Sequence, residues 1–364
     1  MKIPVIIDFE AVSNPFKTYL GLGKAKDSEL FFCYSIAFKT KEGTGGWTKH
    51  FYIPQISWIN NPLHLGRMIL KDIFRYIKNK IGAKSWKEIN NNIQFYGWNP
   101  ELENHFFESF DETKNLIKVK NVYSHDELIS LDKLFDHSSF DKSFFQTKVN
   151  FLKSKNLYDK NSWRQQNGFT AAEYGYFYIY HHRKINARSV RDYYKYSKNL
   201  EEGTLKNELS EYSKYDVIKA SFIYDHINEF QTFLADYKVV KQKLKKELGD
   251  YRASIHLKEY RNLYSVMKLF FKNNPYSNKD KYSLEECYQL IQEHVKDKEQ
   301  PLKEYMDFLT NNPIKKLNCK NMTYEELKNK IIEAQQLWTN KCTEIQNVRR
   351  QIIRSFYTKY IDKK

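Results

Sequence analysis

Cysteine is scarce in this sequence, and the cysteines that it has lie far apart. No CxxC pair occurs among Cys33, Cys287, Cys319 and Cys342, so neither a disulfide framework nor a cysteine-based zinc site is predicted. Unpaired thiols of this kind fit a reducing interior.

Long apolar runs are lacking as well. No stretch of about 18 apolar residues occurs, and Asp8 interrupts the first apolar run, so neither a transmembrane helix nor a signal peptide is predicted. We therefore expect a soluble protein of the cytoplasm. Glycine, alanine and arginine are few beside lysine, asparagine, isoleucine, tyrosine and phenylalanine, a bias typical of A/T-rich coding sequences. Because of this bias, a single lysine or tyrosine carries little functional information.

The chain does have enough apolar side chains for a core. It has 364 residues, of which 41% are hydrophobic and 16% aromatic, so global disorder is not expected, and two domains, or one domain with a large appendage, are expected. Its formal net charge of +16 indicates a polyanionic partner, most simply nucleic acid. A lysine-rich surface without such a partner explains the charge equally well.

The first ten residues contain the feature around which the chain is organised. Val5, Ile6 and Ile7 form an apolar run that is followed by Asp8-Phe9-Glu10. The run predicts a buried strand that delivers two carboxylates at its end. Because the two acids are two residues apart, they lie on one face of the strand and can share one cation. An ordinary exposed strand end has the same pattern.

The elements that follow predict an α/β fold. Strands are expected over 31–38 and 49–53, separated by a turn at Gly43 to Gly46, then a helix over 63–81 and a short strand over 92–96. Asn99 and Pro100 are typical of a helix cap and first helical residue, and 128–135 is a strand or a short helix. This order predicts a ribonuclease H-like mixed sheet flanked by helices.

The region from 136 to 198 allows two interpretations. An aromatic run, Tyr174 to Tyr180, precedes a basic stretch from His181 to Arg191. Aromatic rings interleaved with cations can stack bases and hold phosphates. An amphipathic helix would use the same residues for packing, and we prefer that interpretation.

The C-terminal region is predicted to be all-α. From about residue 232 the pattern is helical, with capping boxes at Ser283-x-x-Glu286 and Thr323-x-x-Glu326 and with prolines at 275, 301 and 313 between segments. An apolar stripe from Leu327 to Ile352 indicates an antiparallel hairpin, a helical domain or a dimer seam. Most of the net positive charge is expected here. We therefore predict domains at 1–230 and 231–364.

Two later sites have acids that can lie near Asp8 and Glu10 in the fold. Tyr212 precedes Asp216 by four residues in a helical context, so the phenol and the carboxylate share one helix face. Glu103 follows Asn99 by four residues and can face the strand that carries Asp8. Each pattern has an ordinary explanation, because Tyr-x-x-x-Asp arises often by chance and acids favour the positive end of a helix. Chance explains all three sites in this order much less well than it explains any one of them.

These motifs resemble those of the DEDD (DnaQ-like, tyrosine-type) 3′→5′ exonuclease superfamily, over residues 1 to about 230. Asp8-Phe9-Glu10 is similar to its first motif, Asn99-x-x-Leu102-Glu103 to its second, and Tyr212-x-x-x-Asp216 to its third. Most of the superfamily has Asp where this chain has Glu103. The wider context, in Phe32-Cys33-Tyr34-Ser35, Leu131 to Phe135 and Asn167 to Ala172, resembles an uncharacterised bacterial branch with Glu in the second motif.

The resemblance implies a two-metal site for Mg²⁺ or Mn²⁺. Asp8 would bridge both ions, Glu10 and Asp216 would complete the first site, Glu103 would serve the second ion, and Tyr212 would orient the attacking water. The implied function is a metal-dependent 3′→5′ exonuclease acting on single-stranded DNA or RNA ends. The basic helical region would bind the phosphates of the strand.

Two other functions stay open at this point. One is an inactive exonuclease-like protein that binds nucleic acid or serves as a scaffold, with a protein partner or self-association through the C-terminal helices. The other is the proofreading portion of a polymerase, which is disfavoured because about 130 residues after the third motif are too few for a polymerase domain.

Overall fold

The computed structural model describes residues 2–20, 29–40, 46–55, 62–124, 128–136, 138–140, 142–159, 162–183, 200–274 and 282–362. The chain divides into two compact units. Unit 1 comprises Met1–Leu234 and Arg354–Lys364, and unit 2 comprises Ala235–Ile353. Within the described ranges, no helix combines the length and the apolar character needed to cross a membrane.

Unit 1 contains a five-stranded mixed sheet in the order β3-β2-β1-β4-β5. The strands are β1 (Ile3–Val12), β2 (Leu30–Lys39), β3 (Trp47–Tyr52), β4 (Ile93–Gly97) and β5 (Lys120–Asn121). β1, β2 and β3 form an antiparallel meander, and β4 and β5 run parallel to β1. The α/β class and the first four strands are therefore confirmed, whereas β5 was not predicted. Most of the expected turn before β3 lies outside the described residues.

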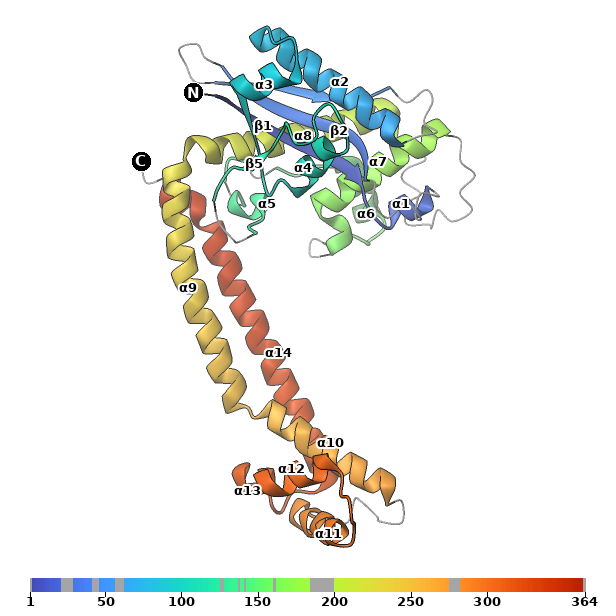
Figure 1. Ribbon diagram of the computed structural model, residues 1–364, viewed down its shortest axis with the longest axis vertical. Coiled ribbons are helices and arrows are strands. Elements are labelled where there is room, and N and C mark those ends of the chain that lie inside the picture. The colour runs from blue at the N-terminus through green and yellow to red at the C-terminus, as the bar shows by residue number, and fades with distance from the viewer. Residues whose placement is uncertain are drawn as a thin grey trace. The chain divides into compact units, whose positions relative to one another are not determined.

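Helices cover both faces of this sheet (Figure 1). They are α1 (Phe16–Tyr19), α2 (Pro62–Ile81), α3 (Trp86–Asn92), α4 (Glu101–Glu108), α5 (Leu131–Leu134), α6 (Gln146–Ser154), α7 (Asn167–Arg183) and α8 (Glu202–Asp225). Val5, Ile7 and Phe9 of β1 pack with apolar residues of α2 and α4 in one core cluster. The alternate residues of β1, Asp8 and Glu10, therefore point to the other face, which α7 and α8 cover.

The strand that carries the two acids is longer than expected. β1 continues past Asp8 to Val12, with a bulge between Glu10 and Ala11, so the acids lie within the strand and not at its end. The prediction of the strand end was wrong because β1 stays paired with β2 beyond the bulge, as far as Val12, and Phe9 and Val12 are buried. The carboxylates are consequently held on a part of β1 that is paired with β2.

In unit 1, the predicted helix cap at Asn99 is wrong, and the predicted packing of the aromatic run is confirmed. Asn99 does not cap α4, which begins at Glu101. Asn99 has a φ of 53° and its Oδ1 accepts a hydrogen bond from the Tyr123 hydroxyl at 2.6 Å. The aromatic run of α7 packs into the core, where Tyr174, Phe177 and Tyr178 are buried, which confirms the packing interpretation. The side chains from His181 to Arg191 lie outside the described residues.

Unit 2 is built around two long antiparallel helices, α9 (Ile227–Ser254) and α14 (Tyr324–Arg354) (Figure 1). Arg349 donates to the Tyr237 hydroxyl at 3.3 Å, Lys341 pairs with Glu247 at 2.5 Å, and Arg252 lies over the Trp338 ring. The apolar stripe of α14 is therefore used within the chain, in an antiparallel hairpin. Its buried members include Leu327, Ala334 and Ile345.

The remaining helices of unit 2 form a core of their own, together with the first turn of α14. They are α10 (Leu257–Asn273), α11 (Leu284–Lys296), α12 (Lys303–Asn311) and α13 (Pro313–Lys316). Both capping boxes are confirmed by reciprocal hydrogen bonds. Pro313 begins α13, and Pro275 lies outside the described residues.

The unit boundary differs from the expected domains at the C-terminus. The expected boundary after residue 230 lies near the observed one after Leu234, but Arg354–Lys364 belongs to unit 1. Phe356 is buried there, with ring centroids 5.3 Å from Phe230 and 5.1 Å from Phe233. A helical stripe in the sequence does not show where the chain leaves one core for another.

Candidate metal centre

Strand β1 and helix α8 bring the first and third motifs together. The Ser213 hydroxyl of α8 donates to the Ser35 hydroxyl of β2 at 2.8 Å, and Ser35 is the strand partner of Asp8. This contact fixes α8 over the sheet face toward which Asp8 and Glu10 point. Asp216 lies one turn further along α8, close to both.

Three carboxylates form one group. An oxygen of Asp8, one of Glu10 and one of Asp216 all lie within 4.8 Å of one another. One oxygen of Asp8, Oδ2, is buried and accepts no hydrogen bond from the described residues. A buried carboxylate oxygen without a partner is costly, and a cation would satisfy it. An all-carboxylate donor set fits a hard divalent ion such as Mg²⁺ or Mn²⁺.

The electrostatics of the group indicate the same need for positive charge. Burial raises the pKa of Asp8 well above its usual value, and the charges of Glu10, Asp216 and Glu103 raise it further. Burial likewise raises the pKa of Glu10, followed by the charges of Asp216 and Glu103. Burial, then the neighbouring Asp132, raises the pKa of Asp216 to about 7. Such shifts are typical of carboxylates packed together without a cation.

Glu103 lies beside this group but is not one of its three members. The first turn of α4 runs close to β1 because Phe106 stacks on Phe9, with ring centroids 4.2 Å apart. The Glu103 carboxylate is 4% exposed, and its Oε1 accepts a hydrogen bond from the Phe9 backbone N–H at 3.3 Å. Burial raises its pKa to about 7. The sequence thus places Glu103 near Asp8 correctly, but one of its oxygens faces the backbone of β1.

Tyr212 lies beside Asp216 on one face of α8, as the sequence predicts. Its hydroxyl acts to lower the pKa of the Asp216 carboxyl group, against the larger effect of burial. Its ring is buried against Phe144 and Phe145, at centroid distances of 5.5 and 5.2 Å. Burial and the charge of Asp216 raise the pKa of Tyr212 well above its usual value, so at neutral pH the hydroxyl is a donor and not a base.

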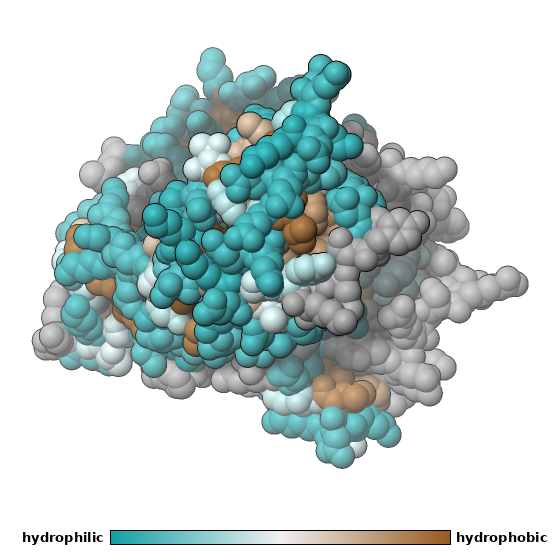
Figure 2. Space-filling view, turned by 90° about the horizontal axis from the view of Figure 1, so that it is seen from below, coloured by the Kyte–Doolittle hydropathy of each residue, from teal (hydrophilic) through white to brown (hydrophobic). Residues whose placement is uncertain are grey.

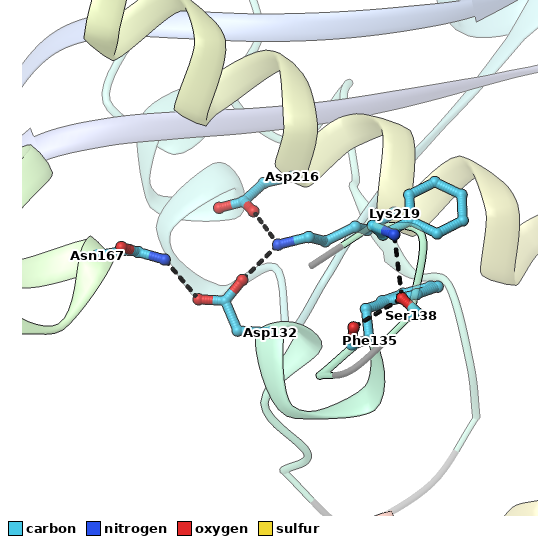
Figure 3. Close-up of polar contacts among 7 residues, drawn as sticks. Asp132, Phe135, Ser138, Asn167, Asp216 and Lys219 are labelled. Carbon is cyan, nitrogen blue, oxygen red and sulfur yellow. Dashed lines mark hydrogen bonds and ion pairs between the residues drawn. The ribbon is translucent and has the colours of Figure 1, made fainter. Parts of the chain in front are cut away.

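Sequence reasoning missed a lysine at this site. The ammonium of Lys219 contacts Asp132 Oδ1 and lies 3.5 Å from Asp216 Oδ1 (Figure 3). Asn167 in turn donates to Asp132 Oδ2 at 3.2 Å. The spacing of Lys219, three residues after Asp216 on one helix, was the available signal. Asp132 and Asn167 stand in the segments that carried the wider family resemblance, where no role was assigned to them.

No protein-family model matches this chain, and no curated protein matches it either.

Proposed function

We propose that the protein is a metal-dependent 3′→5′ exonuclease with a ribonuclease H-like catalytic unit, acting on single-stranded DNA or RNA ends. The observation that carries the proposal is the convergence of Asp8, Glu10 and Asp216, from elements about 200 residues apart, on one three-oxygen group. The order of the sheet supports the fold, since an antiparallel meander followed by parallel strands is the arrangement expected for that core.

Each acidic side chain has a proposed role at this group. Asp8, Glu10 and Asp216 would hold one ion, and the Glu103 oxygen that does not contact the Phe9 N–H would serve a second. When bound, divalent ions would supply an activated water, neutralise phosphate charge and stabilise the departing 3′ oxygen. Tyr212, which keeps its proton at neutral pH, orients the attacking water by hydrogen bonding.

A single-stranded substrate needs cations for its phosphates, and α9 carries exposed lysines. Lys238, Lys245 and Lys246 are exposed and lie on one side of the helix at the spacing i, i+7 and i+8. We propose that this lysine stripe holds phosphates of the strand without reading its sequence.

The direct test uses 3′-labelled oligonucleotides with Mg²⁺ or Mn²⁺. Wild-type protein is expected to release mononucleotides from the 3′ end, and Asp8→Ala and Asp216→Ala to lower the rate by at least about 100-fold. Asp111→Ala, which removes an exposed acid of unit 1, is the matched control. Full activity in both site variants would refute the proposal. Matched DNA and RNA strands in the same assay identify the preferred substrate.

A second candidate is an inactive exonuclease-like protein that binds nucleic acid or serves as a scaffold. The contact between Glu103 and the Phe9 backbone favours it, because this acid then has one oxygen fewer for a second ion. Exposed apolar side chains on α14, Ile332 and Leu337, offer contacts for a protein partner. The face seen in Figure 2 is mostly hydrophilic, with hydrophobic residues in small scattered groups. Tight oligonucleotide binding without product in Mn²⁺ would support this candidate.

A further inference from the structure

The Lys219 ammonium is a buried cation beside a group of acids. Its side chain is 3% exposed and lies over the Phe144 ring, at 5.6 Å from the ring centroid. Its charge reaches Asp8 as well as Asp216. A positive charge at this position offsets part of the repulsion among the carboxylates, and it also repels a divalent ion that binds to them.

Asp132 decides which of two acids holds this ammonium. Lys219 is in close contact with Asp132 Oδ1, whereas Asp216 Oδ1 is 3.5 Å away, at the long end of an ion pair (Figure 3). Asn167 fixes the other oxygen of Asp132 by a hydrogen bond of 3.2 Å. The Asp132 carboxylate is thus anchored from a different element, α7, and draws the ammonium toward itself.

We infer that Asp132, held by Asn167, is a positioning residue that keeps the Lys219 ammonium off Asp216, and that Lys219 is an internal counter-cation of the metal-free group. Asp216 then stays available as a metal ligand, while the acids are partly compensated before a metal binds. This inference rests on the proposed metal centre and adds to it the residues that set its affinity.

The inference predicts opposite effects for the two partners of the ion pair. Asp132→Asn leaves the ammonium with Asp216 alone, so Mn²⁺ affinity is expected to fall about tenfold. Lys219→Met removes the competing charge, so Mn²⁺ affinity is expected to rise by about threefold or more, while the metal-free protein melts at a lower temperature. Asn167→Ala is expected to act like Asp132→Asn, but more weakly. Isothermal titration calorimetry with Mn²⁺ measures all three affinities.

The double variant Asp132→Asn/Lys219→Met separates this mechanism from simple loss of packing. With the released ammonium gone, Mn²⁺ affinity is expected to return to the wild-type value or above it. Asp132→Glu, which keeps the charge, is expected to stay within about threefold of wild type. If both single variants weaken Mn²⁺ binding and the double variant is weakest, the pair is merely structural and the inference is wrong.

The titration also separates this inference from the proposed function. If wild-type protein binds no Mn²⁺, the metal centre itself is wrong and the inference falls with it. If wild-type protein binds Mn²⁺ and the variants do not differ from it, only the role of Asp132 and Lys219 is refuted.

Discussion

Asp8, Glu10 and Asp216 are partly buried acids whose charges repel one another, and this governs how the protein responds to pH. The pKa values of Asp216 and Glu103 are raised to about 7 in the metal-free protein, from ordinary values near 4. Between these values the folded state holds protons that the unfolded state has released. The free energy of unfolding that these groups contribute therefore falls as pH rises through this window.

We expect Asp216→Asn to gain stability relative to wild type as the pH is raised from 5 to 8 in the presence of EDTA. The charged Asp216 is unfavourable in the metal-free fold above its raised pKa, and the amide is not. The difference grows by up to about 1.4 kcal/mol per pH unit within the window. Urea unfolding at several pH values measures it. A difference that stays constant with pH would contradict the prediction.

Magnesium should reverse this dependence in wild-type protein. The ion binds the ionised carboxylates, so millimolar Mg²⁺ is expected to raise the melting temperature more at pH 8 than at pH 5. Asp216→Asn is the control, since it lacks one of the three ligands. An equal response to Mg²⁺ at both pH values, or no response at all, would count against the metal centre.

At the scale of single residues, the sequence predicts what depends on local periodicity. Alternation along a strand places Asp8 and Glu10 on one face, and helical spacing places Tyr212 beside Asp216, as observed. The contact of Lys219 with Asp132 joins residues 87 apart in sequence, and only the packing of α8 against α5 creates it. The hydrogen bond of Glu103 to β1 is equally non-local.

The packing of α7 on the sheet provides a prediction at the scale of the element. A methyl group on Gly175 would lie 2.3 Å from the Phe32 ring of β2, so the helix approaches the strand through this glycine. Gly175→Ala is expected to destabilise the protein by about 1–3 kcal/mol through overpacking. Gly249→Ala is the matched control. It lies within α9 with nothing inside 4 Å, and is expected to stabilise by about 0.5–1 kcal/mol. Urea unfolding compares the two, and equal effects would contradict the close approach.

Elements with a strong pattern were predictable, and weakly patterned ones were not. The apolar spacing over 63–81 gave α2 almost to the residue, and the antiparallel strands followed from their β-branched and aromatic runs. β5 has two residues, and α3 has the polar sequence Trp86–Asn92, so neither shows a period. Both depend on neighbours that the sequence does not reveal: β5 pairs with β4, and Ser85 caps α3 by accepting from the Glu88 N–H.

The lysine stripe of α9 also gives a prediction that belongs to the element. Lys238, Lys245 and Lys246 changed together to Gln should weaken single-strand binding for all sequences alike. The slope of log K against log salt should become shallower by about 2, at about 0.7 per lost phosphate contact. Three exposed lysines of α10, Lys258, Lys268 and Lys272, are the control set. Equal losses from both sets would mean that general charge, and not this stripe, holds the strand.

For the molecule as a whole, the observed unit boundary changes how the net charge is divided between the two units. Unit 2 carries 23 Lys and Arg against 16 Asp and Glu, a net charge of +7 out of the total of +16. The predicted region 231–364 does carry most of the positive charge, but its basic segment Arg354–Lys364 belongs to unit 1, so unit 2 by itself carries less than half. Nucleic-acid contacts are then expected on both units.

The return of the C-terminus to unit 1 makes the last turns of the chain part of the core of that unit. Phe356 is 0% exposed and packs on Phe230 and Phe233, and Arg354 pairs with Asp136 at 2.6 Å. Phe356→Ala should cost about 3–5 kcal/mol through loss of the ring and the cavity that it leaves. Leu337→Ala, which truncates an exposed side chain of α14, should change stability by less than about 0.5 kcal/mol.

Urea unfolding with and without Mn²⁺ shows to which unit the C-terminal segment belongs. On the proposed function, Mn²⁺ stabilises unit 1 alone, because Asp8, Glu10 and Asp216 all lie there. Phe356→Ala is expected to unfold unit 1 at lower urea, although the substitution follows α14 and lies 140 residues after Asp216 in sequence. If it instead destabilised only a transition that is insensitive to Mn²⁺, the C-terminal segment would belong with the helical unit, as the sequence alone predicted.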